Sequence, residues 1–210
     1  MIPQNLHWAF EEGHHVSTPA GTGKTKMHKL ANLVLPSGKI STGYPGDGFS
    51  NEPNKIQPQV LPGTYPALIN VVRRNKGAAG TFAFVALNFT NTKTVSWEST
   101  GQFFTDSGDG CIFDVSLTAL LRKKKNEMSR EEWGQLKTAA LHNGDGNLVL
   151  DEESGVNAII FRTSDWSYNC FIGRDTQGQI SSFVIDGRVQ RPRKNPFMAL
   201  FKLFRPKTKD

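Results

Sequence analysis

Two parts of the chain alternate between apolar and polar residues, or run continuously apolar over short stretches. In the region between these two parts, the apolar residues recur at the spacing of a helix. The first part contains "GTYPALINVVRR", "TFAFVALNFT" and "TVSWESTGQFF", and the second contains "NAIIFRT", "SYNCFIG" and "ISSFVID". A period of two with turn residues between the segments predicts antiparallel strands. For the first part we expect one buried face, which is made of Ile69, Val71, Phe82, Phe84, Val85, Leu87 and Trp97.

Two helices are predicted between these strand clusters. Asp114 can cap the first helix, "VSLTALLRKKK", whose closing lysines suit the negative end of a helix dipole. Ser129 and Glu132 have the spacing of a capping box for "REEWGQLKTAALH", which Gly144 can terminate. The order of strands, helices and strands predicts an α+β fold. We expect a mainly antiparallel β-sheet or sandwich-like body with two helices inserted between the strand clusters.

The remaining segments define the expected domain organisation. Residues 1–29 are predicted to be an irregular N-terminal lead-in, and residues 30–187 a single globular α+β domain. Within the domain, residues 32–42 hold two short apolar runs around a Pro-Ser-Gly turn, which predicts a hairpin. Residues 188–210 form a basic, aromatic C-terminal tail.

Most of the positive charge lies in this tail. The chain carries a net charge of +6, residues 187–210 contribute +7, and the difference leaves −1 for residues 1–186. The tail is therefore expected to dock on the domain or to be disordered, or else to contact an anionic membrane or nucleic acid. No apolar run approaches the roughly 20 residues that span a bilayer, and no signal peptide is visible. Together with only two cysteines, this predicts a cytoplasmic protein.

The segment "TPAGTGKT" (residues 18–25) is similar to a phosphate-binding loop, which requires Gly-x-x-x-x-Gly-Lys-Ser/Thr between a buried strand and a helix. Thr18 stands where the first glycine belongs, and no buried strand precedes the segment. We therefore interpret it as a flexible surface loop and expect no nucleotide ligand.

Three carboxylates around two glycines, Asp106, Asp109 and Asp114, are the candidate metal ligands. Their spacing allows a divalent cation to be held on a loop. The alternative is a structural turn in which the glycines serve the backbone and Asp114 caps the helix that follows. No other cofactor is predicted.

The chain also resembles a known family over about residues 30–186. The segments "LVLPSGKI", "VLPGTYPALINVV", "FVALNFTNTKTVSWE", "TDSGDGCIFDV" and "NCFIGRDTQGQISSFVID" are similar, in this order, to the bacterial domain of unknown function 4241 family. The chain departs from the family's glycine-rich element at Ser164–Asn169. The resemblance supports the α+β fold and implies no activity.

No nucleophile, acid/base pair or cofactor fingerprint is assembled in the sequence, so a non-enzymatic binding protein is the leading hypothesis. Small bacterial families of this kind often neutralise toxins, and we expect an immunity-type protein that occludes a toxin's active site. Such sites consist of aromatic anchors and charged complements, and the predicted contact residues are Trp166, Tyr168, Arg174 and Asp175. The alternatives are a metal-dependent hydrolase that uses Asp106, Asp109 and Asp114, and a membrane or nucleic-acid binder that acts through the tail.

Overall fold

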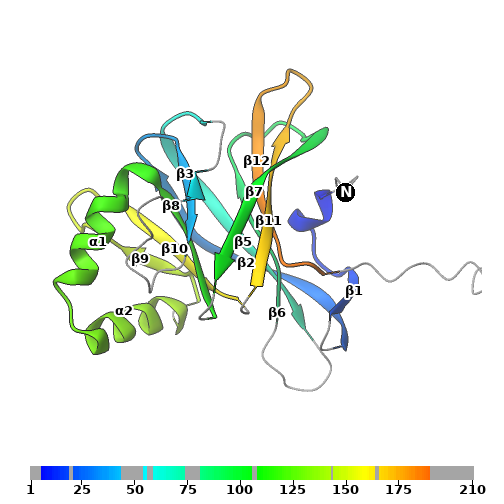
Figure 1. Cartoon of the computed structure of the whole chain (residues 1–210). Helices are drawn as coiled ribbons and strands as arrows, with labels where there is room; N and C mark the ends of the chain where they lie inside the picture. The colour runs from blue at the N-terminus through cyan, green and yellow to red at the C-terminus, as the bar shows by residue number, and fades with distance from the viewer. Residues whose placement is uncertain are drawn as a thin grey trace, which may run out of the picture.

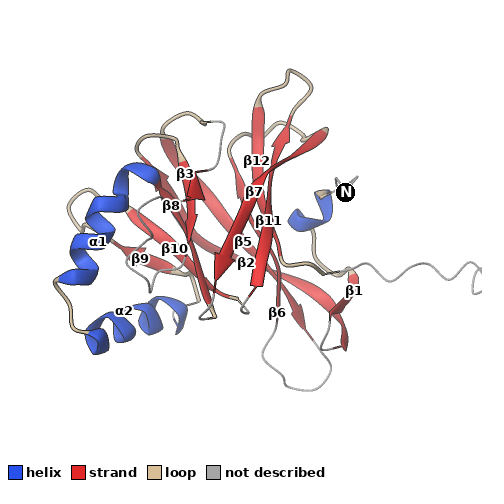
Figure 2. Ribbon diagram, in the orientation of Figure 1, coloured by secondary structure: helices blue, strands red, loops and turns tan. Residues whose placement is uncertain are grey.

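The computed structural model describes residues 6–18, 21–43, 54–55, 59–73, 81–105, 108–142, 144–163 and 166–189. Strands dominate these residues, and two helices lie together at one side (Figures 1 and 2). Every strand pairing is antiparallel in the described part of the chain. The predicted α+β class, with helices inserted between strand clusters, is confirmed.

The strands form two sheets. Sheet A has seven strands in the order β1 (His15–Thr18), β2 (Gly21–Leu35), β5 (Gly63–Arg73), β6 (Thr81–Asn88), β12 (Ile180–Asp186), β11 (Trp166–Arg174) and β7 (Ser96–Thr105). Sheet B has five strands in the order β4 (Asn54–Lys55), β3 (Ile40–Gly43), β8 (Asp109–Asp114), β10 (Asn157–Arg162) and β9 (Asn147–Val149).

Three apolar clusters hold these layers together. One lies between the sheets and joins the inner face of sheet A, through residues such as Val85, to Ile112 and Ile159 of sheet B. A second covers the outer face of sheet A, where Trp8 of a short 3-10 helix (His7–Phe10) packs edge-on against Phe84 at 4.5 Å. The third lies between sheet B and the helices.

Both faces of β6 are therefore buried, which explains its continuous apolar run. Phe82, Val85 and Leu87 belong to the cluster between the sheets, whereas Ala83, Phe84 and Ala86 belong to the outer cluster. The single buried face expected from the sequence is wrong in this respect. Phe84 and Trp97 lie on the outer side of sheet A, and Ile69 and Val71 are only half-buried.

The helices begin as their capping residues predict. Asp114 accepts a 2.8 Å hydrogen bond from Ser116 N–H at the start of a 3-10 turn (Val115–Leu117), which leads into α1 (Thr118–Asn126). At α2 (Arg130–His142), Ser129 N–H donates to the Glu132 carboxylate at 2.7 Å, and Glu132 N–H donates to Ser129 Oγ at 3.2 Å. Leu121 and Trp133 then bury their side chains against sheet B.

The predicted hairpin over residues 32–42 is wrong, because its two arms belong to different sheets. β2 pairs with β1 and β5, whereas β3 pairs with β4 and β8. Gly38 makes the turn between them with φ +69°, and a Cβ there would lie 2.0 Å from the Val60 carbonyl oxygen. A local turn signal cannot show which strands will become neighbours.

The irregular lead-in predicted for residues 1–29 is also corrected. Residues 15–18 and 21–29 lie in β1 and β2, and residues 21–24 pair with β1. Gly23 allows close packing, because a Cβ there would lie 2.5 Å from the Arg73 carbonyl oxygen. Residues 21–25 are thus an extended strand and form neither a flexible loop nor a phosphate-binding loop, which needs a compact turn before a helix. Of the predicted tail, residues 188–210, all but Arg188 and Val189 lies outside the described residues.

Candidate functional site

An open groove lies at one end of the inner face of sheet A, where β5 begins and the β11–β12 hairpin turns. Its volume is about 580 Å³. Three segments that are distant in the chain line it: the approach to β5 with its first residues, the end of β6, and the hairpin. The lining residues are Gln59, Val60, Leu61, Pro62, Tyr65, Phe89, Thr90, Arg174, Gln179 and Ile180.

Tyr65 fixes the shape of one side of the groove. Its hydroxyl donates a 2.6 Å hydrogen bond to the carbonyl oxygen of Leu61, and its ring contacts Phe89 edge-on at 5.0 Å. Gly63 leaves room for this conformation, because a Cβ there would stand a tight 3.1 Å from Tyr65 Oη. Burial raises the pKa of Tyr65 above its ordinary value of 10.0, so the hydroxyl stays protonated and keeps donating at neutral pH.

Leu61 is the most exposed apolar side chain of the groove. It is 81% exposed, although its own carbonyl is held by Tyr65 and the neighbouring Val60 is buried. An exposed apolar side chain on a fixed backbone pays little entropy on binding, so it suits an anchor that enters a pocket on another molecule.

Arg174 supplies positive charge on the opposite side. Its Nε donates to Glu98 Oε2 at 3.0 Å, and its NH1 donates to the Gly178 carbonyl at 2.9 Å. These bonds hold the guanidinium at the hairpin while its side chain remains 31% exposed. A guanidinium has five N–H donors, so donors remain for a carboxylate on a partner.

Asp175 organises the turn instead of facing a partner. It is only 7% exposed, and it accepts 2.9 Å hydrogen bonds from Gln177 N–H and Gln179 N–H and a 3.0 Å bond from Thr92 Oγ1. Burial favours the neutral acid, but the hydrogen bonds outweigh burial and lower the pKa of Asp175. The carboxylate therefore holds the hairpin in the conformation that presents Arg174.

Of the predicted contact residues whose side chains the structure describes, Arg174 alone lines the groove. Tyr168 is wrong as a surface contact, because it is 4% exposed and its ring stacks on Phe103 at 5.5 Å inside the core. The side chain of Trp166 lies outside the described residues. Sequence reasoning missed Leu61, Tyr65 and Phe89. The "PGTYP" segment (residues 62–66) contains Tyr65 and follows Leu61, but we assigned it no role in a site, and no signal marks Phe89.

The predicted metal ligands do not come together. Asp109 and Asp114 lie at the two ends of β8, about 16 Å apart along the strand. They also point to opposite faces, since five residues separate them. Asp106 lies outside the described residues. Among the residues that are described, no group of three metal-ligating side chains is found.

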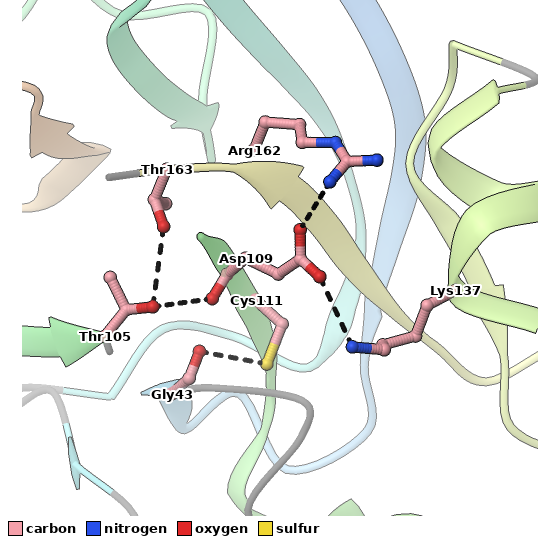
Figure 3. A network of polar contacts seen from close by, with 7 residues as sticks. All are labelled: Gly43, Thr105, Asp109, Cys111, Lys137, Arg162 and Thr163. Atoms are coloured by element: carbon pink, nitrogen blue, oxygen red, sulfur yellow. Dashed lines mark hydrogen bonds and ion pairs between the residues drawn. The ribbon is translucent and has the colours of Figure 1, made fainter. Parts of the chain in front are cut away.

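Asp109 instead joins helix α2 to sheet B (Figure 3). Its Oδ2 lies 3.3 Å from Lys137 Nζ and its Oδ1 lies 3.5 Å from Arg162 NH1. The side chains of Asp109 and Lys137 are only 11% and 15% exposed. Thr105 Oγ1 donates to the Asp109 carbonyl at 2.8 Å and fixes the backbone of the same residue. The carboxylate thus neutralises two cations that reach it from different elements.

Asp114 is fully occupied as a cap. Its two oxygens accept hydrogen bonds of 2.6 to 2.8 Å from the N–H and hydroxyl groups of both Ser37 and Ser116. Four protein donors surround a side chain that is 0% exposed, which confirms the alternative interpretation of this residue as a structural cap.

The two thiols are also structural. Cys111 Sγ donates to the Gly43 carbonyl at 3.3 Å, and burial raises the pKa of Cys111 far above its ordinary value. Burial likewise raises the pKa of Cys170 to about 12. Both side chains are fully buried and remain thiols at neutral pH, so neither is placed to act as a nucleophile.

Comparison with known proteins places this geometry in a family. The sequence model of a family described as "Protein of unknown function (DUF4241)" matches residues 33–185, most of the chain. The chain belongs to the DUF4241 family. No curated protein and no solved structure gives a significant match. In this DUF4241 protein the matched region contains both sides of the groove, the Asp109 network and both helices. In the described part of the chain, neither helix has the length and apolar character needed to cross a membrane.

Proposed function

We propose that this DUF4241 protein is a non-enzymatic binding protein that uses the groove between the start of β5 and the β11–β12 hairpin to contact another protein. The observation that carries the proposal is the exposed Leu61, on a fixed backbone, across the groove from the held guanidinium of Arg174. An apolar anchor with a charged group nearby is the arrangement that protein interfaces use for affinity and for register.

The form of the groove favours a protein over a small molecule. Small-molecule sites enclose most of the ligand surface within a concave cavity. Here the groove is open and Leu61 points outward with 81% exposure, so it offers a projection that a partner can enclose. The antiparallel strands behind the groove keep its two sides fixed, and a fixed surface loses little free energy on association.

The chemistry of the described residues favours binding over catalysis. Both thiols are buried, Asp114 is surrounded by four donors, and Asp109 neutralises Lys137 and Arg162. Each of these groups has a structural partner that accounts for its presence. We therefore assign them to stability and the groove to function.

The more specific form of the proposal is an immunity-type protein that acts in the cytoplasm and occludes the active site of a toxin. An inhibitor of this kind needs a rigid complementary surface and no chemistry of its own, and the groove offers such a surface. The assignment to a toxin rests on analogy with other small families of unknown function.

The test uses the protein encoded by the neighbouring gene as the partner. We expect it to bind the full chain and its toxicity to disappear on co-expression. Leu61→Asp places a charge where the partner encloses an apolar group, so it should weaken binding by about a hundredfold, the size of a moderate hot-spot effect. Phe104→Ser is the matched control, because Phe104 is 61% exposed on β7, away from the groove. Equal losses in both variants, or no binding by the unaltered protein, would refute the proposal.

A further inference from the structure

A row of basic side chains crosses three strands at the other end of the inner face of sheet A. His15 of β1 lies opposite Lys24 of β2, and Lys24 lies opposite Arg73 of β5. Lys26 follows two residues later on the same face of β2. His15, Lys24, Lys26 and Arg73 are all exposed, and we call them the cationic shelf. In Figure 1 this end of sheet A lies at the lower right, away from α1 and α2.

The shelf continues a face that is apolar elsewhere. Leu30 and Ile69, farther along β2 and β5, pack in the cluster between the sheets. Toward β1, His28 lies opposite Ile69 and Lys26 lies opposite Val71, and both Ile69 and Val71 are half-buried. The face thus changes from core to an exposed surface in which aliphatic side chains alternate with cations, as in the mixed apolar and polar composition of protein interfaces.

The arrangement is unfavourable for the isolated protein. Like charges directly opposite each other on neighbouring strands destabilise a sheet, and Lys24 and Arg73 are such a pair. Among the described residues, Lys24, Lys26 and Arg73 form no ion pair. Their field reaches His28, whose pKa is lowered first by burial and then by the charges of Arg73 and Lys26, against a smaller opposing effect of Glu12.

The size of the shelf distinguishes a protein partner from a nucleic acid. Proteins that bind DNA through phosphates make about 6 to 10 such contacts on a strongly basic surface. The shelf supplies three permanent charges, and residues 1–186 carry a net charge of −1. A small group of cations on a nearly neutral body suits charge complementarity with a protein.

We infer that the cationic shelf binds an extended acidic segment of a protein partner, whose carboxylates neutralise Lys24, Lys26 and Arg73. Side chains two residues apart on an extended segment are about 6.8 Å apart, the same spacing that separates Lys24 from Lys26 along β2. The inference rests on the proposed function only in taking the partner to be a protein, since the shelf and the groove share no residue.

The binding test uses a fluorescent synthetic peptide in which glutamate alternates with valine, added to the full chain at about 0.05 M salt. We expect saturable binding that weakens as salt is raised. The triple variant Lys24→Gln, Lys26→Gln, Arg73→Gln should lose about tenfold in affinity, the sum of three exposed ion pairs. The control removes two exposed lysines and an exposed arginine elsewhere, Lys39→Gln, Lys123→Gln and Arg130→Gln, and should retain the affinity.

Three results would overturn the inference. One is the absence of peptide binding, and another is an equal loss in the shelf and control variants, which would show a response to net charge alone. The third is tighter binding of an oligothymidine of equal charge, which would make the shelf a nucleic-acid surface. Leu61→Asp should leave peptide binding unchanged, so failure at the shelf is distinguishable from failure at the groove.

A second measurement needs no ligand. Because Lys24 and Arg73 repel each other, Arg73→Thr should raise the melting temperature of the free protein by about 1 to 3 °C. The difference should shrink at high salt, which screens the repulsion. A lower melting temperature for Arg73→Thr would show that the arginine contributes to stability, and it would contradict the inference.

Discussion

The hydroxyl of Tyr65 donates a 2.6 Å hydrogen bond to the carbonyl oxygen of Leu61, four residues earlier in the chain. This bond ties the start of strand β5 to the residues that precede it, and it fixes the backbone that carries the most exposed apolar side chain of the groove. The relationship links a local sequence feature to the proposed contact surface, and it can be tested without knowing the partner.

Tyr65→Phe removes the bond and keeps the ring contact with Phe89. We expect the free energy of unfolding to fall by about 1 kcal/mol, the usual net contribution of one hydrogen bond. Urea unfolding monitored by circular dichroism measures this loss. Thr64→Ala, at an exposed position of the same strand, should change stability by less than about 0.5 kcal/mol. If the two variants are equally stable, the hydrogen bond from Tyr65 to Leu61 does not stabilise the start of β5.

The Asp109 network predicts that two substitutions at one site lower the free energy of unfolding by different amounts. Asp109→Ala leaves Lys137, whose side chain is 15% exposed, without its carboxylate, and we expect a loss of about 2 to 4 kcal/mol. Arg162→Ala removes a cation that is 66% exposed and should cost less than about 1 kcal/mol. Chemical denaturation of both variants measures the two losses of stability and compares them. A double variant, Asp109→Leu with Lys137→Met, should recover most of the loss, and a failure to recover would contradict this account.

Asp186 predicts a fall in stability as the pH rises. Burial raises the pKa of Asp186 to about 6, despite opposing contributions from the N–H group and the charge of Arg188. The folded protein therefore holds this proton more tightly than the unfolded chain does. The resulting stabilisation is complete below about pH 4 and is lost as the pH rises through about 6, and it amounts to about 3 kcal/mol.

Asp186→Asn should remove this slope, because an amide does not ionise, and the variant should be the more stable protein at pH 7. Urea unfolding at a series of pH values from 4 to 7 compares the two proteins, where other titrating groups contribute equally. Glu153→Gln, at an exposed position, is the control and should keep the slope of the unaltered protein. Parallel curves for Asp186→Asn and the unaltered protein would rule out this assignment.

Gly23 and Gly134 predict opposite effects of the same substitution. Gly23→Ala would place a Cβ 2.5 Å from the Arg73 carbonyl oxygen, so β2 and β5 have to separate, and we expect a loss of about 1 to 3 kcal/mol. Gly134 lies in α2 with no atom within 4 Å of its Cβ position, so Gly134→Ala should gain up to about 1 kcal/mol. Thermal unfolding of both variants tests the pair. A neutral Gly23→Ala would show that this glycine is not required for strand packing.

The fold was predictable where local chemistry determines it. Strands such as β10 and β12 follow from their apolar runs, and the capping box of Ser129 and Glu132 marks the start of α2. The N-terminal part of β2 was not predictable, because Lys24 and Lys26 of "KTKMHKL" are exposed where an apolar face is expected, and a strand is recognised by such a face. The turn before β3 depends on Asp114, which binds Ser37 from 77 residues away.

The candidate site was less predictable than the fold. Tyr65 and Phe89 read as core residues because strands usually bury their aromatic side chains, and only the hydrogen bond to Leu61 and the groove reveal their role. Tyr168 was wrongly predicted to be a surface contact. The alternation of apolar and polar residues shows which side chains share a face of a strand, but it does not show which face is covered. Arg174 lines the groove, where Glu98 holds its guanidinium, and its role as a partner contact stays a prediction.

Strand β5 connects the groove to the cationic shelf. Tyr65 and Arg73 lie eight positions apart on the same strand, which corresponds to about 27 Å. A rigid strand keeps this distance constant, so the two surfaces can act as a bivalent receptor. A partner long enough to reach both would bind with an avidity that neither surface provides alone, because the first contact raises the local concentration of the second. Short fragments of such a partner would bind weakly and independently, and linking them with a spacer of the right length would restore tight binding.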